Sequence, residues 1–283
     1  MSDKTNAAMA EFWNGDGGTK WLNFEDRLEA SLHVFGDRAL ACAHVQAGQR
    51  VLDVGCGCGA TTLELARRVG PGGRVKGLDI STTLASRAKN NARAAGVSNV
   101  EFECADAQTS DLGDESFDLV FSRFGVMFFD EPVGAFANLR TSLKSGGRLV
   151  FAAWASREQN SWVAEPLQRV AKHMELPQAP PADAPGPFSL GDPARLKNLL
   201  GEAGYSEITV EAFSAPLVLG DDIPEAVHFL MNLSPSGGAI SAANPDQEIL
   251  ERIAADLARM LEAHQTRGSV AMEASALIVS ADK

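Results

Sequence analysis

One stretch decides how this chain of 283 residues folds: Val51-Leu52-Asp53-Val54-Gly55-Cys56-Gly57-Cys58-Gly59-Ala60-Thr61-Thr62. Its apolar start predicts a buried strand that ends near Asp53. The three glycines that follow let the backbone turn sharply and approach a ligand closely before a helix begins. A phosphate would favour backbone N–H groups and often a lysine at this point, whereas Asp53 contributes a negative charge. The loop therefore favours a ligand that carries cationic groups.

The motif Asp53-x-Gly55-x-Gly57-x-Gly59 resembles the first motif of the class I S-adenosylmethionine-dependent methyltransferases, in particular the ubiquinone/menaquinone-biosynthesis-like branch. The resemblance implies that Asp53 and the loop Gly55–Gly59, with Cys56 between the glycines, cradle the methionine half of S-adenosyl-L-methionine. A looser dinucleotide fingerprint also fits these glycines, with an acid about 20 residues further on. An NAD(P)-dependent oxidoreductase is therefore the main alternative.

Strand and helix patterns alternate over residues 50–155, which predicts a parallel sheet with helices on both faces. Seven strands are expected, over 51–54, 74–79, 100–104, 117–122, 148–153, 208–213 and 276–280. Their number matches the α/β, Rossmann-like, doubly wound methyltransferase sheet, which is mostly parallel with an antiparallel last strand beside the fifth. We expect an N-terminal helical lid (1–45), a cofactor-binding core (46–220 with 270–283) and a helical insertion that caps it (221–269).

Acids recur at the ends of the first three strands. Asp53 ends the first and Asp79 the second, and Asp106 lies just past the third. A carboxylate only accepts hydrogen bonds, so it suits ribose hydroxyls and an exocyclic amine. By resemblance, Asp79 binds both ribose hydroxyls, Ile80 packs on the adenine, and Asp106 with Ala107 receives the adenine amino group. A dehydrogenase would leave Asp53 opposing a pyrophosphate and Asp106 without a role.

The segment after the fourth strand begins at Ser122, which we include among the cofactor-binding residues. It lacks the Asn/Asp-Pro-Pro-Tyr/Phe motif of methyltransferases that act on base or Gln nitrogens. It also lacks the Asp of the metal-dependent catechol type, and no metal is expected. Phe124, Phe128 and Phe129 follow, and they could line an apolar substrate pocket or belong to the core.

Two tryptophans, Trp13 and Trp21, bracket a glycine-rich turn near the N-terminus. This block resembles an N-terminal segment of one bacterial branch of the family, in which such tryptophans fold over the cofactor. The resemblance implies that Trp21 contacts S-adenosylmethionine. The alternative is a segment that simply packs on the sheet.

Methyl transfer from a sulfonium is an in-line displacement, so alignment and exclusion of water are the main requirements. A general base is needed only for a hydroxyl or a protonated amine. His228 is the candidate base, because it lies with Asn232 on a polar stripe of the inserted helix. A solvated helix face is the alternative interpretation.

Composition limits the partners. A net charge of −12 without a basic cluster disfavours nucleic acid, and no apolar run is long enough to span a bilayer, so we expect a cytoplasmic protein. The expected partner is a small-molecule methyl acceptor, and S-adenosyl-L-homocysteine is the expected product. A helix over Pro245–His264, capped by Asn244, carries an apolar face that could pack on its own cap or form a homodimer. A non-catalytic S-adenosylmethionine-binding protein and a protein or RNA target are the remaining alternatives.

Overall fold

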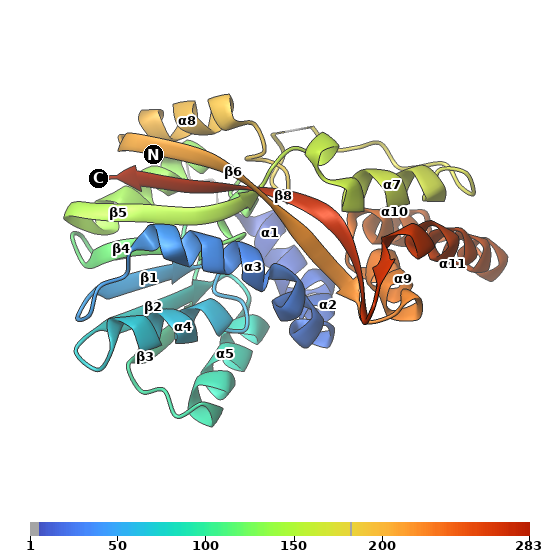
Figure 1. Ribbon diagram of the computed structural model, residues 1–283. Coiled ribbons are helices and arrows are strands. Elements are labelled where there is room, and N and C mark those ends of the chain that lie inside the picture. The colour runs from blue at the N-terminus through green and yellow to red at the C-terminus, as the bar shows by residue number, and fades with distance from the viewer. Residues whose placement is uncertain (1–5, 182) are drawn as a thin grey trace.

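The chain forms one mixed sheet with the strand order β3-β2-β1-β4-β5-β8-β6 (Figure 1) in a computed structural model that describes residues 6–181 and 183–283. The first four strands and β5 run parallel, and β8 is antiparallel to both β5 and β6. The expected doubly wound sheet with an antiparallel last strand beside the fifth is confirmed. The strands are β1 (Arg50–Val54), β2 (Arg74–Asp79), β3 (Val100–Cys104), β4 (Phe117–Arg123), β5 (Leu143–Trp154), β6 (Ser206–Gly220), β7 (Gln265–Thr266, paired with β8) and β8 (Ser269–Asp282).

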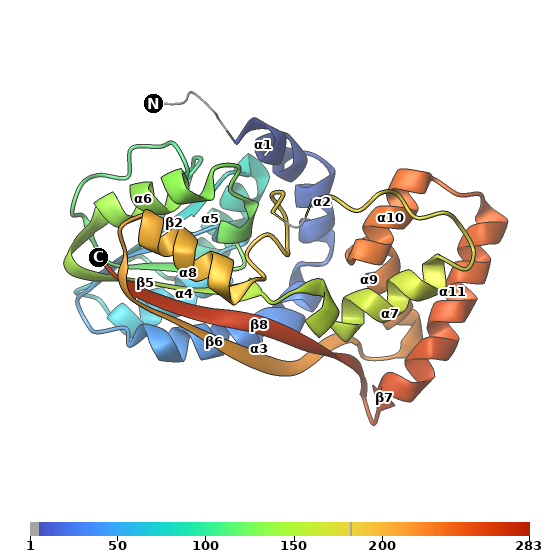
Figure 2. The ribbon, with the colours of Figure 1, turned by 90° about the horizontal axis from the view of Figure 1, so that it is seen from above.

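Helices cover both faces of the sheet, with α3 and α4 on one side and α6 and α8 on the other (Figure 2). Their bounds are α3 (Glu25–Ala43), α4 (Ala60–Val69), α5 (Thr82–Ala94), α6 (Pro132–Ser142) and α8 (Pro193–Glu202). In α5, Ser81 is the N-cap, as its position predicts, since its hydroxyl accepts from Leu84 N–H. The α3 helix falls within the expected lid, described from residue 6 onward, yet it packs on β4, β5, β6 and β8. Its buried Leu32 and Phe35 make it a sheet helix, which leaves the shorter α1 (Ala7–Asn14) and α2 (Asp16–Asn23) over the strand ends.

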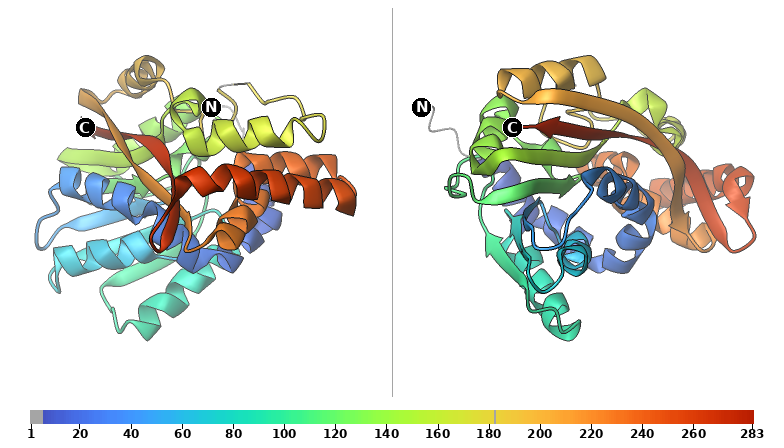
Figure 3. Two further views of the ribbon diagram at one scale, coloured as in Figure 1. Left: turned by 45° about the vertical axis from the view of Figure 1, so that its right-hand side comes forward. Right: turned by 60° about the vertical axis from the view of Figure 1, so that its left-hand side comes forward.

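Strands β6 and β8 extend beyond the other strands of the sheet (Figure 3). Pairing of β8 with β5 ends at Trp154 opposite Ala276, whereas its pairing with β6 continues to Gly220 opposite Val270. The sequence predicts only the part of each strand that lies within the sheet, and in β6 Pro216 interrupts the strand pattern beyond that part. Pro216 is tolerated because β6 is an edge strand, where a missing N–H need not break the ladder.

The part of the β6–β8 pair that extends beyond β5 is connected to three helices, α9 (Ile223–Asn232), α10 (Pro235–Ala243) and α11 (Gln247–Leu261). The predicted N-cap at Asn244 is wrong. Asn244 instead ends α10 in the left-handed region, at φ 44°, and Asp246 caps α11 by accepting from Ile249 N–H at 2.9 Å. The apolar face of α11 packs within the chain, against α9 and α7 (Ser161–Val170), so it is covered without a second subunit. Among the described residues, no helix combines the length and the apolar character that crossing a membrane requires.

The glycine-rich turn predicted after Trp13 is wrong, because Gly17 and Gly18 lie inside α2. A Cβ at Gly17 would stand 2.3 Å from the Phe12 ring, and one at Gly18 would stand 2.1 Å from the carbonyl oxygen of Trp13. The two glycines are therefore required for close packing of α1 on α2, and Gly15 separates the helices.

Candidate functional site

A cavity of about 630 Å³ opens at the carboxyl ends of the strands, under α1 and α2 and beside the α9–α10 pair. It has two halves of different chemistry. The strand-end half is lined by residues at or just past the ends of β1, β2 and β3, namely Gly55, Gly57, Asp79, Ile80, Asp106 and Ala107. The aromatic half is lined by bulky apolar side chains, among them Phe124, Met127, Phe129, Trp154, Trp162 and Phe188. Open α/β sheets bind ligands at this edge.

The glycine loop reaches the cavity floor through two residues in the left-handed region, Gly55 at φ 66° and Gly57 at φ 55°. A Cβ at Gly55 would stand 2.6 Å from the Cα of Gly125, so the loop and the segment after β4 touch backbone to backbone. Gly55 and Gly57 have no side chains of their own, so a ligand can approach the backbone of the loop closely.

Asp53 ends β1 beneath this loop and is fully buried. Its Oδ2 accepts hydrogen bonds from the hydroxyls of Thr61 (2.8 Å) and Thr62 (2.6 Å), which ties the strand end to the first turn of α4. Burial raises the pKa of Asp53 to about 6, although the two hydroxyls and the Arg123 charge lower it in part. Its Oδ1 has no protein partner, so this buried oxygen can still accept a hydrogen bond.

Asp79 and Asp106 both line the strand-end half. The carboxylate of Asp79 accepts from the N–H groups of Gly57 and Ser81, each at 2.8 Å, and its second lone pairs remain available. Burial raises the pKa of Asp79, and the two backbone donors lower it only in part. Asp106 is half-buried and accepts from Gln108 N–H at 3.0 Å. Both carboxylates therefore hold local turns and still offer acceptors to a ligand.

The N-terminal helices α1 and α2 cover the strand-end half of the cavity. The Asn14 side chain donates to Ile80 O (3.0 Å) and accepts from Thr82 N–H (3.0 Å), which anchors the end of α1 beside Asp79. Trp21 lines the cavity, with its Nε1 3.6 Å from the place of a Cβ on Gly57. Trp13 packs edge-on against Trp21 at 5.7 Å between ring centres.

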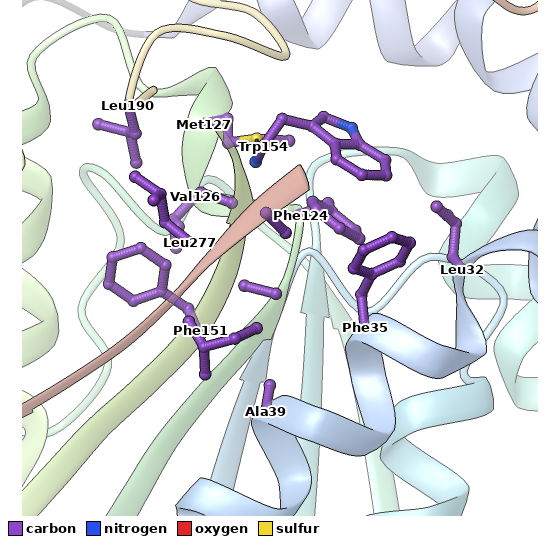
Figure 4. Close-up of a cluster of buried hydrophobic side chains, with 14 of the residues drawn as sticks. Leu32, Phe35, Ala39, Phe124, Val126, Met127, Phe151, Trp154, Leu190 and Leu277 are labelled. Carbon is purple, nitrogen blue, oxygen red and sulfur yellow. Dashed lines mark hydrogen bonds between the residues drawn. The ribbon is translucent and has the colours of Figure 1, made fainter. Parts of the chain in front are cut away.

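The aromatic half continues the buried core of the sheet (Figure 4). Phe124 stacks on Trp154 with ring centres 4.2 Å apart, and Phe35 of α3 meets the Trp154 ring edge-on at 5.1 Å. Phe124 has φ 62°, a strained value for a bulky residue, so the packing must hold it in place. The two expectations for Phe124, Phe128 and Phe129 are therefore not exclusive, because all three line the cavity and two of them are also core.

Five of the predicted site residues do not line the cavity: Asp53, Cys56, Gly59, Ser122 and His228. Cys56 is buried with Phe102 on the other side of the loop, and Gly59 approaches Ala88. The Ser122 hydroxyl donates to Val54 O at 2.8 Å and accepts from Gly125 N–H at 3.1 Å, so it holds the segment that meets the loop. His228 is exposed, stacks on Phe24 at 5.0 Å, and contacts Asn232 through Nδ1 at 3.2 Å.

Sequence reasoning missed the anchoring residues of α1 and most of the aromatic half. Asn6, whose side chain donates to Phe128 O at 3.1 Å, and Asn14 have no motif around them. Asn14 follows directly after the half-buried Trp13, and a polar residue beside such a tryptophan is a usable signal. The missed wall residues include Leu217, Phe229 and Phe188, which come from three separate elements or loops. Within residues 6–181 and 183–283, no group of three or more His, Cys, Asp or Glu side chains could hold a metal ion.

Residues 46–204 match a family model described as a methyltransferase domain. Among curated proteins, the aklanonic acid methyltransferase of Streptomyces sp. (strain C5) is 36% identical over 129 residues, covering 45% of this chain and 59% of that protein. The ubiquinone/menaquinone biosynthesis C-methyltransferase of Pseudomonas fluorescens is 35% identical over 133 residues, covering 46% of this chain and 52% of that protein. The matches therefore extend over only about half of either partner.

Among solved structures, the YcgJ protein of Bacillus subtilis superposes with a TM-score of 0.59 at 18% identity, over 89% of this chain and 98% of that one. At this identity the likeness concerns the fold alone. It extends beyond residues 46–204, so the fold is shared over most of the chain.

Proposed function

We propose that this chain, which belongs to the methyltransferase domain family, transfers the methyl group of S-adenosyl-L-methionine to an apolar small molecule. One observation carries the proposal. A single cavity joins a half that offers backbone and carboxylate acceptors to a half with aromatic walls. The first half suits a polar adenosyl cofactor and the second an apolar acceptor, so the two ligands would meet inside one enclosure.

The residues of the strand-end half fit that cofactor. The Asp79 carboxylate retains lone pairs for ribose hydroxyls, Asp106 can accept from the adenine amine, and Ile80 and Trp21 offer apolar faces. Asp53 supplies negative charge beneath the loop, and its Oδ1 still lacks a donor. When bound, S-adenosylmethionine supplies a methyl group on a positively charged sulfur, which leaves S-adenosyl-L-homocysteine.

The aromatic half would hold the acceptor and exclude water. Its walls come from the segment after β4, the end of β5 and the cap helices, and they are mainly carbon. The names of the two curated relatives refer to aklanonic acid and to ubiquinone/menaquinone biosynthesis, which supports an apolar acceptor of small-molecule class. The Phe124 ring, stacked on Trp154 and carried by a strained backbone, would give the acceptor a rigid flat surface.

The chain's own contribution to the reaction is alignment rather than proton transfer. Among the described residues that line the cavity there is no histidine, and His228 stacks on Phe24 outside this lining. An acceptor that is already nucleophilic would need no base. His228 therefore remains a sequence prediction without support from its position. The cytoplasmic location, the absence of nucleic-acid partners and a homodimer likewise stay predictions.

Calorimetric titration with S-adenosylmethionine, S-adenosylhomocysteine, NAD and NADP tests the cofactor. We expect saturable binding of the two adenosyl ligands and none of the nicotinamide ligands. An acceptor screen over apolar small molecules, read by release of S-adenosylhomocysteine, then tests transfer. Binding of NAD or NADP in place of the adenosyl ligands would refute the proposal, and adenosyl binding without turnover on any acceptor would favour a non-catalytic binding protein.

A further inference from the structure

Among the described residues, three cationic side chains line the cavity: Lys20, Arg123 and Arg157. Two of them are already neutralised. Lys20 Nζ lies 3.0 Å from Asp16 Oδ2, and the Arg123 guanidinium makes two bonds to the Glu29 carboxylate, at 2.9 and 2.5 Å. Burial alone would raise the pKa of Glu29, but the Arg123 hydrogen bond and charge outweigh it and lower that pKa. The Arg123–Glu29 pair therefore stays ionised, and the two charges neutralise each other.

Arg157 differs from these two. It opens the short helix η2 (Arg157–Gln159), three residues after Trp154 ends β5, and it is half-buried. Its guanidinium carbon lies 5.4 Å from the ring centre of Phe188, and no carboxylate of a described residue lies within ion-pair distance. The neighbouring Glu158 is exposed, and bonds from its own N–H and from Ser156 lower the pKa of its carboxyl, with a smaller contribution from the Arg157 charge. Its hydrogen bonds lie within the turn, and water around the exposed carboxylate weakens its attraction to Arg157.

A guanidinium beside an apolar wall is poorly solvated, and the Phe188 ring compensates only in part. A planar anion that enters the cavity could accept two parallel N–H bonds from it. Attraction between charges is stronger where protein replaces water. In a chain of net charge −12, such a cation also offsets part of the repulsion that an anionic ligand would meet.

We propose that Arg157 binds an acidic group of the methyl acceptor, so that the acceptors are apolar ring compounds carrying a carboxylate or a comparable anion. This inference rests on the proposed function, because it takes the aromatic half to be the acceptor site. Phe124 and Trp154 would hold the rings while Arg157 fixes the orientation of the acid. The rival is that Arg157 binds the carboxylate of the cofactor.

Calorimetry separates these possibilities. The protein is saturated with S-adenosylhomocysteine and titrated near neutral pH with 3-hydroxy-2-naphthoic acid and with 2-naphthol, its uncharged counterpart. We expect the acid to bind at least about tenfold more tightly than 2-naphthol, as a hydrogen-bonded ion pair predicts. In Arg157→Gln that preference should fall to about twofold or less, while Arg157→Lys should keep part of it.

Arg267→Gln is the matched control, since it removes one positive charge from an exposed turn outside the cavity lining. It should bind both probes as the parent protein does, and thermal unfolding checks that both variants are folded. An equal preference in Arg157→Gln and Arg267→Gln, or no preference in the parent protein, would overturn the inference. So would weaker S-adenosylhomocysteine binding in Arg157→Gln with the acid preference intact. Failure of the parent protein to bind S-adenosylhomocysteine would instead refute the proposed function.

Discussion

The two halves of the cavity are built in different ways. The strand-end half comes from short turns that each follow a strand, and its main ligand groups are backbone atoms and carboxylates such as Asp79. The aromatic half is assembled from segments distant in the sequence, including Trp154 at the end of β5 and Phe229 on α9. One half is fixed by local backbone conformation, and the other by how remote elements pack.

This difference separates cofactor recognition from acceptor choice. A backbone loop held by Gly55 and Gly125 tolerates almost no change, because any added atom meets main chain. A wall of side chains can be altered residue by residue at modest cost, since ring compounds are recognised by shape and area. We therefore expect substitutions to act strongly on cofactor binding in the first half and weakly on acceptor binding in the second.

The largest effect is expected for Gly125→Ala. Its Cβ would stand 2.6 Å from the Val54 carbonyl oxygen and 2.8 Å from the Gly55 Cα, and neither backbone atom can move aside. We expect a loss of about 3 kcal/mol in the free energy of unfolding, with loss of S-adenosylhomocysteine binding. Denaturant unfolding and calorimetry measure both.

Gly134→Ala is the control for that substitution. Gly134 lies on the exposed side of α6, and a Cβ there would meet no atom within 4 Å. Alanine at this helical position should stabilise the protein by up to about 1 kcal/mol. If the two variants proved equally stable, the close contact between the glycine loop and the segment after β4 would be wrong.

Asp79→Ala comes next. Removing the carboxylate deletes the two hydrogen bonds that the expected ribose hydroxyls would donate to it, and it leaves the N–H groups of Gly57 and Ser81 without their acceptor. Affinity for S-adenosylhomocysteine should fall at least about a hundredfold, since bonds to a charged group contribute about 1.5–3 kcal/mol each. Asp106→Ala should cost about tenfold, because Asp106 is half-buried and solvent weakens its interactions. Unchanged affinity in the Asp79 variant would remove this acid from the site.

The sequence predicts the strand-end half well for a physical reason. Gly55, Asp79 and Asp106 each lie at or just past the end of a strand of a βα unit. Parallel strands bring their carboxyl ends to one edge, so spacing along the chain becomes proximity in space. All seven strands in the main path were predicted, though β6 and β8 as fragments.

The aromatic half could not be predicted in the same way. Its position depends on how far β6 and β8 extend past the sheet. In β6, Pro216 interrupts the strand pattern, so the sequence does not indicate that extension. The α10 helix was missed because Ser236, Gly237 and Gly238 resemble a loop. Arg157 carries no motif, and its importance lies in what surrounds it, which periodicity does not report.

Asp53→Asn tests, through the pH dependence of stability, whether the buried carboxylate beneath the glycine loop is ionised. Burial raises the pKa of Asp53 from its ordinary 3.8 to about 6, so the folded protein holds this proton more tightly than the unfolded chain. The ionised carboxylate therefore destabilises the fold above about pH 6, by on the order of 3 kcal/mol, and this penalty disappears as the pH falls toward 4.

The amide of the variant can still accept from Thr61 and Thr62 but never ionises. We expect Asp53→Asn to unfold at a higher temperature than the parent protein near pH 8, with the difference vanishing near pH 4. Its affinity for S-adenosylmethionine should nevertheless fall, since negative charge beside the sulfonium is lost. A stability difference independent of pH would show that Asp53 is not ionised at a cost in the folded protein.

The smallest effect is expected in the aromatic half, for Phe188→Leu. Phe188 is half-buried on the cavity wall, and leucine keeps the wall apolar while removing a ring face. With S-adenosylhomocysteine bound, affinity for the uncharged 2-naphthol should fall about two- to fivefold, the range for one aromatic contact. Affinity for S-adenosylhomocysteine itself should stay within about twofold. Asp106→Ala should behave in the opposite way, losing adenosyl affinity and, once saturated, binding 2-naphthol normally. If either substitution weakened the binding of both ligands equally, the two halves would act as one site. The distinction between recognition by the backbone in one half and by side chains in the other would then not hold for this protein.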